Sequence, residues 1–331
     1  MRSAPRAFLV ATARNEAPYF LEWVAHHIEV GFTDIVIFQN DSDDLTHQTL
    51  RTLRDIGAIR YFYNRAKMGA HQVRAYMRAS SLPEYAVADW AIALDLDEFL
   101  VVKAGRGHLT DLLAASPPSD CIHLNWRLFG NAGHLLPSND LVTERFRLAN
   151  WQLGDDEHFG AYKCLFRPQH FERPGIHRPA GPKRPIEDIA MTNGSGLPLA
   201  EYRLRNYNST DPGGCRLAQI NHYITRDLAS FMLKGQRGSA HQANRPIGRR
   251  YWSQRNRNHD LDTAALRYLP RTRERMRALD EASGGRLELL RRKAVALHLA
   301  RFEALMELPE HRKFYDFCLS RSALQDMQEV A

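Results

Sequence analysis

The first hundred residues alternate between short apolar runs and longer segments whose apolar positions recur every three or four residues. Residues 7–13, AFLVATA, predict one buried strand, because six of the seven side chains are apolar. Residues 18–31 follow with helical spacing, and Pro18 and Gly31 suit the start and the end of a helix. The same alternation predicts strands at 34–41, 58–64 and 90–102, separated by helices at 42–57 and 70–83.

This order of elements predicts the α/β class. Four strands separated by three helices, with short links, are typical of a mostly parallel sheet that carries helices on both faces. Residues 103–225 are richer in Gly, Pro, Asn and His, and contain long loops of the kind that are usually functional or disordered. We expect two more strands there, at 120–130 and 161–168.

Helical spacing returns after Asp227 and defines the predicted domain organisation. We expect one domain over residues 1–225, with a first half at about 6–102 and a second at about 103–225, followed by a helical extension over 226–331.

The composition predicts a soluble protein and narrows its partners. The chain has 331 residues, of which 44% are hydrophobic, and no apolar run approaches the roughly 20 residues that span a bilayer. The N-terminus lacks the pattern of a signal peptide, so a cytoplasmic location is expected.

The formal charge of +7 is concentrated in the C-terminal third. Residues 226–331 contain 21 Lys and Arg against 13 Asp and Glu. Such a surplus suits nucleic acid, acidic lipid, an anionic glycan, or simply a solvated helical surface. The chain has no recognised nucleic-acid motif, so nucleic acid is not an expected partner.

The four cysteines, Cys121, Cys164, Cys215 and Cys318, are far apart in sequence. They contain no C-x-x-C pair, and a chain of this length does not need a disulfide framework. We therefore expect buried free thiols rather than a zinc site.

Three acids interrupt the apolar segment WAIALDLDEFLVV. In an extended chain, Asp95 and Asp97 point to the same side, at the carboxyl end of a parallel strand, where open α/β sheets bind ligands. Carboxylate oxygens suit Mg²⁺ or Mn²⁺, although a strand that leaves the core with solvated acids has the same pattern. Glu98 is expected to face the other way and to pair with an Arg or a backbone N–H.

The order of several motifs resembles the GT-A glycosyltransferases, close to glycosyltransferase family 2 and the related family 92. VATARNEAPYFLEWVAHHIEVGF resembles the first strand and helix of that group, DIVIFQNDSDDLT its nucleotide-contacting turn, and ALDLDEF its D-x-D segment. The segment INHYITRDLASFMLKGQRG resembles bacterial members. The similarity spans roughly residues 6–240.

The resemblance implies a GT-A-like fold and a metal-dependent enzyme. Such an enzyme moves a sugar from a nucleotide-sugar donor to a glycan or glycolipid acceptor, in cell-envelope or extracellular polysaccharide synthesis. It also implies Mn²⁺ or Mg²⁺ as cofactor, and it allows peripheral contact with the inner membrane surface. A non-catalytic, nucleotide-binding relative that acts as an interaction module is the alternative.

The resemblance also assigns site residues. Asp95, Asp97 and His222 are the implied metal ligands. The implied contacts of the nucleotide are Arg14, Asn40, Asp41, Lys67, Gly69, Arg74 and Asp95. Asp188, beside Glu187, and His177 are the candidate catalytic groups, with Asp156 and Glu157 as rivals.

Overall fold

The structure is a computed structural model that describes residues 4–65, 71–150, 161–199, 214–236 and 248–322. Lys67, Gly69, Asp156 and Glu157 lie outside these ranges, so their predicted roles stay predictions. In the described part of the chain, no helix is both long and apolar enough to cross a membrane.

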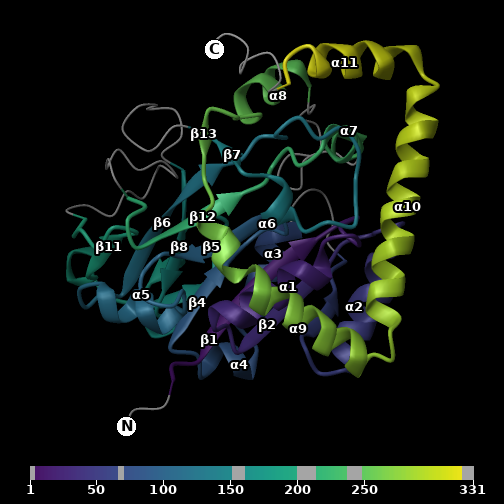
Figure 1. Ribbon diagram of the computed structural model, residues 1–331. Helices are drawn as coiled ribbons and strands as arrows, with labels where there is room; N and C mark the ends of the chain where they lie inside the picture. The colour runs from purple at the N-terminus through teal and green to yellow at the C-terminus, as the bar shows by residue number, and fades with distance from the viewer. Residues whose placement is uncertain (1–3, 66–70, 151–160, 200–213, 237–247, 323–331) are drawn as a thin grey trace.

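The N-terminal half contains the predicted alternation of strands and helices (Figure 1). Its first helix ends where the sequence predicts, because Gly31 adopts a φ of 113° and its N–H bonds back to His27 and Ile28. The elements are β1 (Ala7–Ala13), α1 (Phe20–Val30), β2 (Asp34–Gln39), α2 (Thr46–Asp55), β3 (Arg60–Tyr63), α3 (His71–Ala79), α4 (Pro83–Ala86) and β4 (Trp90–Ala93).

The predicted single strand over 90–102 is wrong. β4 ends at Ala93, and the chain turns before β5 (Glu98–Val102) begins. The Glu98 N–H donates to the Asp95 carbonyl at 3.0 Å, and the Asp95 N–H donates to the Glu98 carboxylate at 2.8 Å. The acids in the middle of the predicted strand therefore close the turn that separates β4 from β5.

The second half extends the same sheet. Its larger elements are α5 (Leu109–Ala115), β6 (Cys121–Leu128), β8 (Tyr162–Phe166), β11 (Met191–Asn193), β12 (Ala218–His222) and α7 (Leu228–Gln236). Shorter elements are α6 (Val142–Arg145), β7 (Leu148–Ala149), β9 (Phe171–Arg173), β10 (Ala180–Pro182) and β13 (Asp260–Leu261). Among the described residues, short 3₁₀ turns lie at Pro168–His170, Ile186–Asp188 and Ala264–Tyr268.

Nine of the described strands form one mostly parallel sheet, in the order β3-β2-β1-β4-β8-β6-β12-β5, with β11 beside β6. Strands β1, β2, β3 and β4 pair in parallel, whereas β8 and β5 run antiparallel to their neighbours. This arrangement confirms the predicted α/β class.

The two faces of the sheet have separate cores. Leu9 and Ile37 point to the face covered by α1, whereas Val10 and Val36 point to the face covered by α3. The strands are apolar on both faces because helices cover both, as in other parallel sheets.

The C-terminal helices are α8 (Arg249–Arg255), α9 (Leu269–Ala282), α10 (Arg286–Met306) and α11 (Pro309–Leu319). They confirm the predicted helical C-terminus, and α9 packs against α1 (Figure 1). Tyr268, Met276 and Leu287 share the core cluster of the sheet. The predicted boundary at residue 225 stays a prediction, but residues beyond it contribute to the same core.

Candidate active site

The loop that follows β1 is fixed to the loop that follows β2. The Asn15 amide donates to Asp43 at 2.8 Å, and the Asp43 N–H returns a bond to the Asn15 side chain at 2.9 Å. The Glu16 N–H donates to the Thr46 hydroxyl at 3.0 Å. These bonds hold the predicted nucleotide-binding turn at the carboxyl end of the parallel strands.

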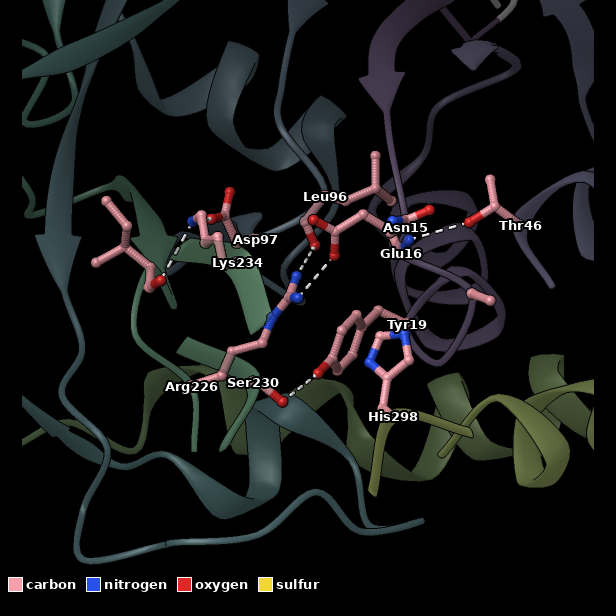
Figure 2. A network of polar contacts seen from close by, with 12 residues as sticks. Asn15, Glu16, Tyr19, Thr46, Leu96, Asp97, Arg226, Ser230, Lys234 and His298 are labelled. Carbon is pink, nitrogen blue, oxygen red and sulfur yellow. Dashed lines mark hydrogen bonds and ion pairs between the residues drawn. The ribbon is translucent and has the colours of Figure 1, made fainter. Parts of the chain in front are cut away.

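Arg226 connects this loop to the D-x-D turn (Figure 2). Its guanidinium donates to the Glu16 carboxylate at 2.7 Å and to the Leu96 carbonyl at 2.9 Å. It also lies 3.5 Å from the ring centre of Tyr19. Burial alone would lower the pKa of Arg226, but Glu16 and Tyr19 raise it above its ordinary value, so the side chain stays charged.

Asp97 is buried between a lysine and a histidine. The Lys234 ammonium lies 2.5 Å from Oδ2, and the His222 Nε2 lies 3.7 Å from Oδ1 (Figure 2 shows the ion pair). Burial would raise the pKa of Asp97, but Lys234 and His222 hold it well below its usual range. Burial lowers the pKa of His222, so its ring is neutral near pH 7.

Asp95 faces a different set of partners. It accepts hydrogen bonds from Gln72 at 2.9 Å and from the buried Lys163 at 3.2 Å. Lys163 also lies 3.1 Å from Glu98, whose pKa burial raises to about 8. The expected backbone N–H partner of Glu98 is confirmed, and the cation beside it is a lysine rather than an arginine.

The predicted metal ligands fit a divalent cation in part. The distance from Asp97 Oδ1 to His222 Nε2 is compatible with two ligands of one ion, and a carboxylate with a neutral imidazole suits Mn²⁺. Among the described residues, three potential ligand atoms lie within 4.8 Å of one another only at a different place in the fold. The Asp95 carboxylate is therefore not that close to both Asp97 and His222. The metal roles of all three stay predictions.

A cavity of about 470 Å³ lies beside this network. Its wall combines the β1 loop, part of the β2 loop, the loop before α7, α7 itself and one face of α10, and it carries more cationic than acidic side chains. The polar residues at this wall are Arg14, Asn15, Glu16, Tyr19, Asp43, Thr225, Arg226, Ser230, Lys234, Gln236, His298 and Arg301. An anionic ligand suits a pocket of this charge.

The predicted nucleotide contacts are spread over neighbouring loops. Arg14 lines the cavity. Asn40 is buried and accepts a hydrogen bond from Asn64 at 2.7 Å, whereas Asp41 is exposed and accepts one from the Tyr63 hydroxyl. Arg74 is exposed on α3 and is not among the residues at the cavity wall.

The two candidate catalytic groups lie in different places. The His177 ring is 5.3 Å from the Trp126 ring, which in turn is 4.3 Å from His222, so His177 lies on the side of the proposed metal ligands. Asp188 is exposed and lies just before β11. The first residue of β11 pairs with the first residue of β6, whereas His222 pairs with the last residue of β6. Seven residues of strand, about 23 Å, separate these ends.

Several residues of this network are absent from the predictions made from sequence. Lys163 had a detectable signal, because a lysine inside an apolar strand needs a buried acid as its partner. Arg226 and Lys234 lie in the segment INHYITRDLASFMLKGQRG, whose sequence alone does not indicate that they pair with Glu16 and Asp97. His298 and Arg301 are 254 and 258 residues from their partners Asp44 and Asp43, and no local pattern shows that α10 reaches the site.

Comparison with known families adds an independent observation. The sequence model of glycosyltransferase family 92 matches residues 10–213, more than half of the chain. The chain belongs to glycosyltransferase family 92. The predicted resemblance and the predicted transferase class are thereby confirmed. In this family 92 chain, Asp95 and Asp97 lie inside the matched residues, whereas His222, Arg226 and Lys234 follow them.

Solved structures resemble the family 92 chain only distantly. S. aureus TarS (residues 1–349) has 13% identity and a TM-score of 0.32, over 49% of this chain and 47% of that one. HddC from Yersinia pseudotuberculosis has 9% identity and a TM-score of 0.31, over 57% and 91%. Glucosyl-3-phosphoglycerate synthase from Mycobacterium tuberculosis, in a structure with Mn²⁺, UDP and glucosyl-3-phosphoglycerate, has 14% identity and a TM-score of 0.26, over 38% and 45%. The chain thus spans about half the length of the TarS structure. No curated protein sequence matches the chain significantly.

Proposed function

We propose that this family 92 enzyme transfers a sugar from a nucleotide-sugar donor to a glycan or glycolipid acceptor. The observation that carries the proposal is the position of Asp97. This buried carboxylate lies in the turn after β4, with Lys234 and His222 beside it, next to a cavity lined by further cations. Family membership supplies the reaction class, and the cationic wall supplies the fit for a diphosphate.

The chain's own side chains suit the charge that develops during transfer. As the bond between the sugar and the diphosphate breaks, negative charge grows on the departing nucleotide. Arg14 in the β1 loop and Lys234 on α7 line the cavity, and so does Arg226, which Glu16 holds in place. Fixed cations stabilise such a charge more than water does, because they need not reorganise.

A divalent cation belongs to the same proposal. Asp97 and His222 are the residues that would hold Mn²⁺ or Mg²⁺, with Asp95 as a further ligand, and the ion would supply Lewis-acid neutralisation of the diphosphate. Lys234 then has to share Asp97 with the ion, because its ammonium contacts one carboxylate oxygen.

We propose His177 as the general base. It is half-buried, and one aromatic ring separates it from His222. Asp188 lies toward the other end of β6, so we do not give it a role in the reaction. We further propose that the acceptor belongs to cell-envelope or extracellular polysaccharide synthesis. The enzyme would then be cytoplasmic and contact the inner membrane surface.

A non-catalytic nucleotide-binding protein is the second candidate function. The observation that favours it is that Lys234 already neutralises Asp97, so a nucleotide has a charged, preformed pocket without any need for turnover. This alternative predicts binding of nucleoside diphosphates with no release of sugar from any donor.

Asp97→Asn tests the proposal. We expect release of nucleoside diphosphate, measured over a panel of nucleotide-sugars with Mn²⁺ and an acceptor mixture, to fall by at least about 100-fold. Asp55→Asn, which changes an exposed acid at the end of α2, is the matched control and should keep full activity. Metal-dependent turnover that is unchanged in Asp97→Asn would contradict the assignment.

A further inference from the structure

Three metal-ligating side chains that do not line the cavity meet on one face of the sheet. Cys121 and His123 are two residues apart on β6, so they point to the same face, and Cys164 on β8 is paired directly with His123. The two sulfur atoms and one ring nitrogen all lie within 4.8 Å of one another.

The surroundings of these three side chains are dry. Cys121, His123 and Cys164 are 0%, 3% and 4% exposed. The Tyr162 ring stacks on His123 at 4.3 Å between centres, and both cysteines belong to the apolar cluster between the sheet and α3. Bulk water therefore has little access to these three side chains.

We propose that Cys121, His123 and Cys164 bind one thiophilic metal ion, Zn²⁺ or Cu⁺, at a site distinct from the one around Asp97. Two thiolates and an imidazole are the donors that such ions prefer, whereas Mg²⁺ and Mn²⁺ prefer the oxygens around Asp97. Ligand atoms around tetrahedral zinc are about 3.5–3.8 Å apart, so these three need to approach by only about 1 Å.

Metal binding at this site is coupled to the loss of protons from the two thiols. Thiolates rather than thiols ligate metal ions, so Cys121 and Cys164 release their protons to the solvent when the ion binds. Binding of the ion should therefore weaken as the pH falls.

Met191 provides a fourth soft donor nearby. On the other side of β6, Met191 pairs in register with Cys121 and lies in the same apolar cluster. Its thioether favours Cu⁺ over Zn²⁺, so Met191→Leu should weaken Cu⁺ binding and leave Zn²⁺ binding unchanged.

Metal content of the untagged, full-length protein tests the proposal. The protein is reconstituted under reducing conditions with Zn²⁺ or with Cu⁺, passed over a desalting column and analysed by mass spectrometry of the metal. We expect about one ion per chain in the wild type, and less than about one tenth in Cys121→Ser and in Cys164→Ser. Cys318→Ser, which changes a buried cysteine of α11, is the matched control and should keep the ion.

A second measurement does not depend on the folding of variants. Co²⁺ added to the wild type should give the intense visible bands of a tetrahedral site and a thiolate-to-metal charge-transfer band, and Zn²⁺ should abolish both. A wild type with four reactive thiols that binds neither Zn²⁺ nor Cu⁺ would overturn the proposal. So would a disulfide between Cys121 and Cys164 in protein purified without an added oxidant, or metal content that both serine variants retain.

Discussion

At the residue scale, Asp97 shows how much of the site a short sequence motif can reveal. The D-x-D pattern and the apolar run before it located the acid at the end of a strand and predicted a divalent cation beside it. The motif did not reveal Lys234, because that side chain comes from α7, 137 residues later in the chain. Local spacing carries information about the strand end, but not about which distant cation reaches it.

Lys234→Met should increase the affinity for Mn²⁺. Its ammonium contacts the same carboxylate that we propose as a metal ligand, so removing the charge removes a competitor and a like charge. We expect the dissociation constant of Mn²⁺, measured by electron paramagnetic resonance, to fall by about tenfold. Lys313→Met, an exposed lysine of α11, is the control. Weaker binding of Mn²⁺ in Lys234→Met would show that the lysine does not compete with the ion.

His26 makes stability depend on pH. Burial lowers the pKa of His26 to about 4, while its ring bonds to the Leu100 carbonyl at 2.8 Å. The unfolded chain takes up a proton below about pH 6.5 and the folded chain does not, so stability is complete above that pH and is lost toward pH 4. Between about pH 7.5 and pH 5, we expect His26 to account for a loss of about 2 kcal/mol.

Urea unfolding of His26→Gln at the two pH values checks this expectation. Glutamine keeps an N–H donor for Leu100 but does not titrate, so the variant should lose about 2 kcal/mol less than the wild type does on acidification. His47→Gln, which changes an exposed histidine of α2, should behave as the wild type. An equal acid-induced loss in His26→Gln and the wild type would assign the effect to other groups.

At the element scale, periodicity was a good guide to the helices and to strands that are apolar throughout. It failed at residues 90–102, where β4 and β5 are two strands that pair with different neighbours. Apolar content alone does not distinguish one long buried strand from two short ones separated by a buried turn. The acids distinguish the two cases, because the Glu98 carboxylate accepts a hydrogen bond from the Asp95 N–H and the Lys163 ammonium contacts both carboxylates.

Lys163→Met should destabilise the turn between β4 and β5. The change leaves Glu98 fully buried without its cation, and above about pH 8, where Glu98 is ionised, breaking such a pair costs about 3–5 kcal/mol. The double variant Lys163→Met/Glu98→Gln removes both charges and should recover most of that loss, as measured by urea unfolding. If the double variant is as unstable as the single one, the ion pair does not hold the turn together.

At the scale of the whole molecule, α10 runs along one side of the fold and closes the cavity (Figure 1). Arg301 donates to the Asp43 carboxylate at 2.8 Å, and His298 lies 3.3 Å from Asp44. Sequence analysis placed this helix in a separate extension, because its own pattern indicates only a helix. Which face of the sheet a distant helix covers depends on packing between segments, and no local pattern reports it.

Arg301→Gln should weaken donor binding more than it weakens the fold. Asp43 is exposed, so the lost ion pair contributes at most about 1 kcal/mol to stability. The lost charge at the cavity should raise the dissociation constant of the nucleoside diphosphate by about 3- to 10-fold in isothermal titration calorimetry. Arg292→Gln, an exposed arginine of the same helix, is the control. Equal effects of the two changes would mean that α10 only supports the fold.

The turn between β4 and β5 has its charged partners far along the chain, and this distance determines when a newly synthesised chain can assemble the site. Strands β1 to β4 pair with one another within the first 93 residues, so this part of the sheet can form while synthesis continues. Asp97 has to wait for Lys234, and Glu16 for Arg226, 210 residues later. A ribosome-bound chain that ends before α7 is therefore expected to possess a largely formed nucleotide-side sheet but no assembled reaction centre.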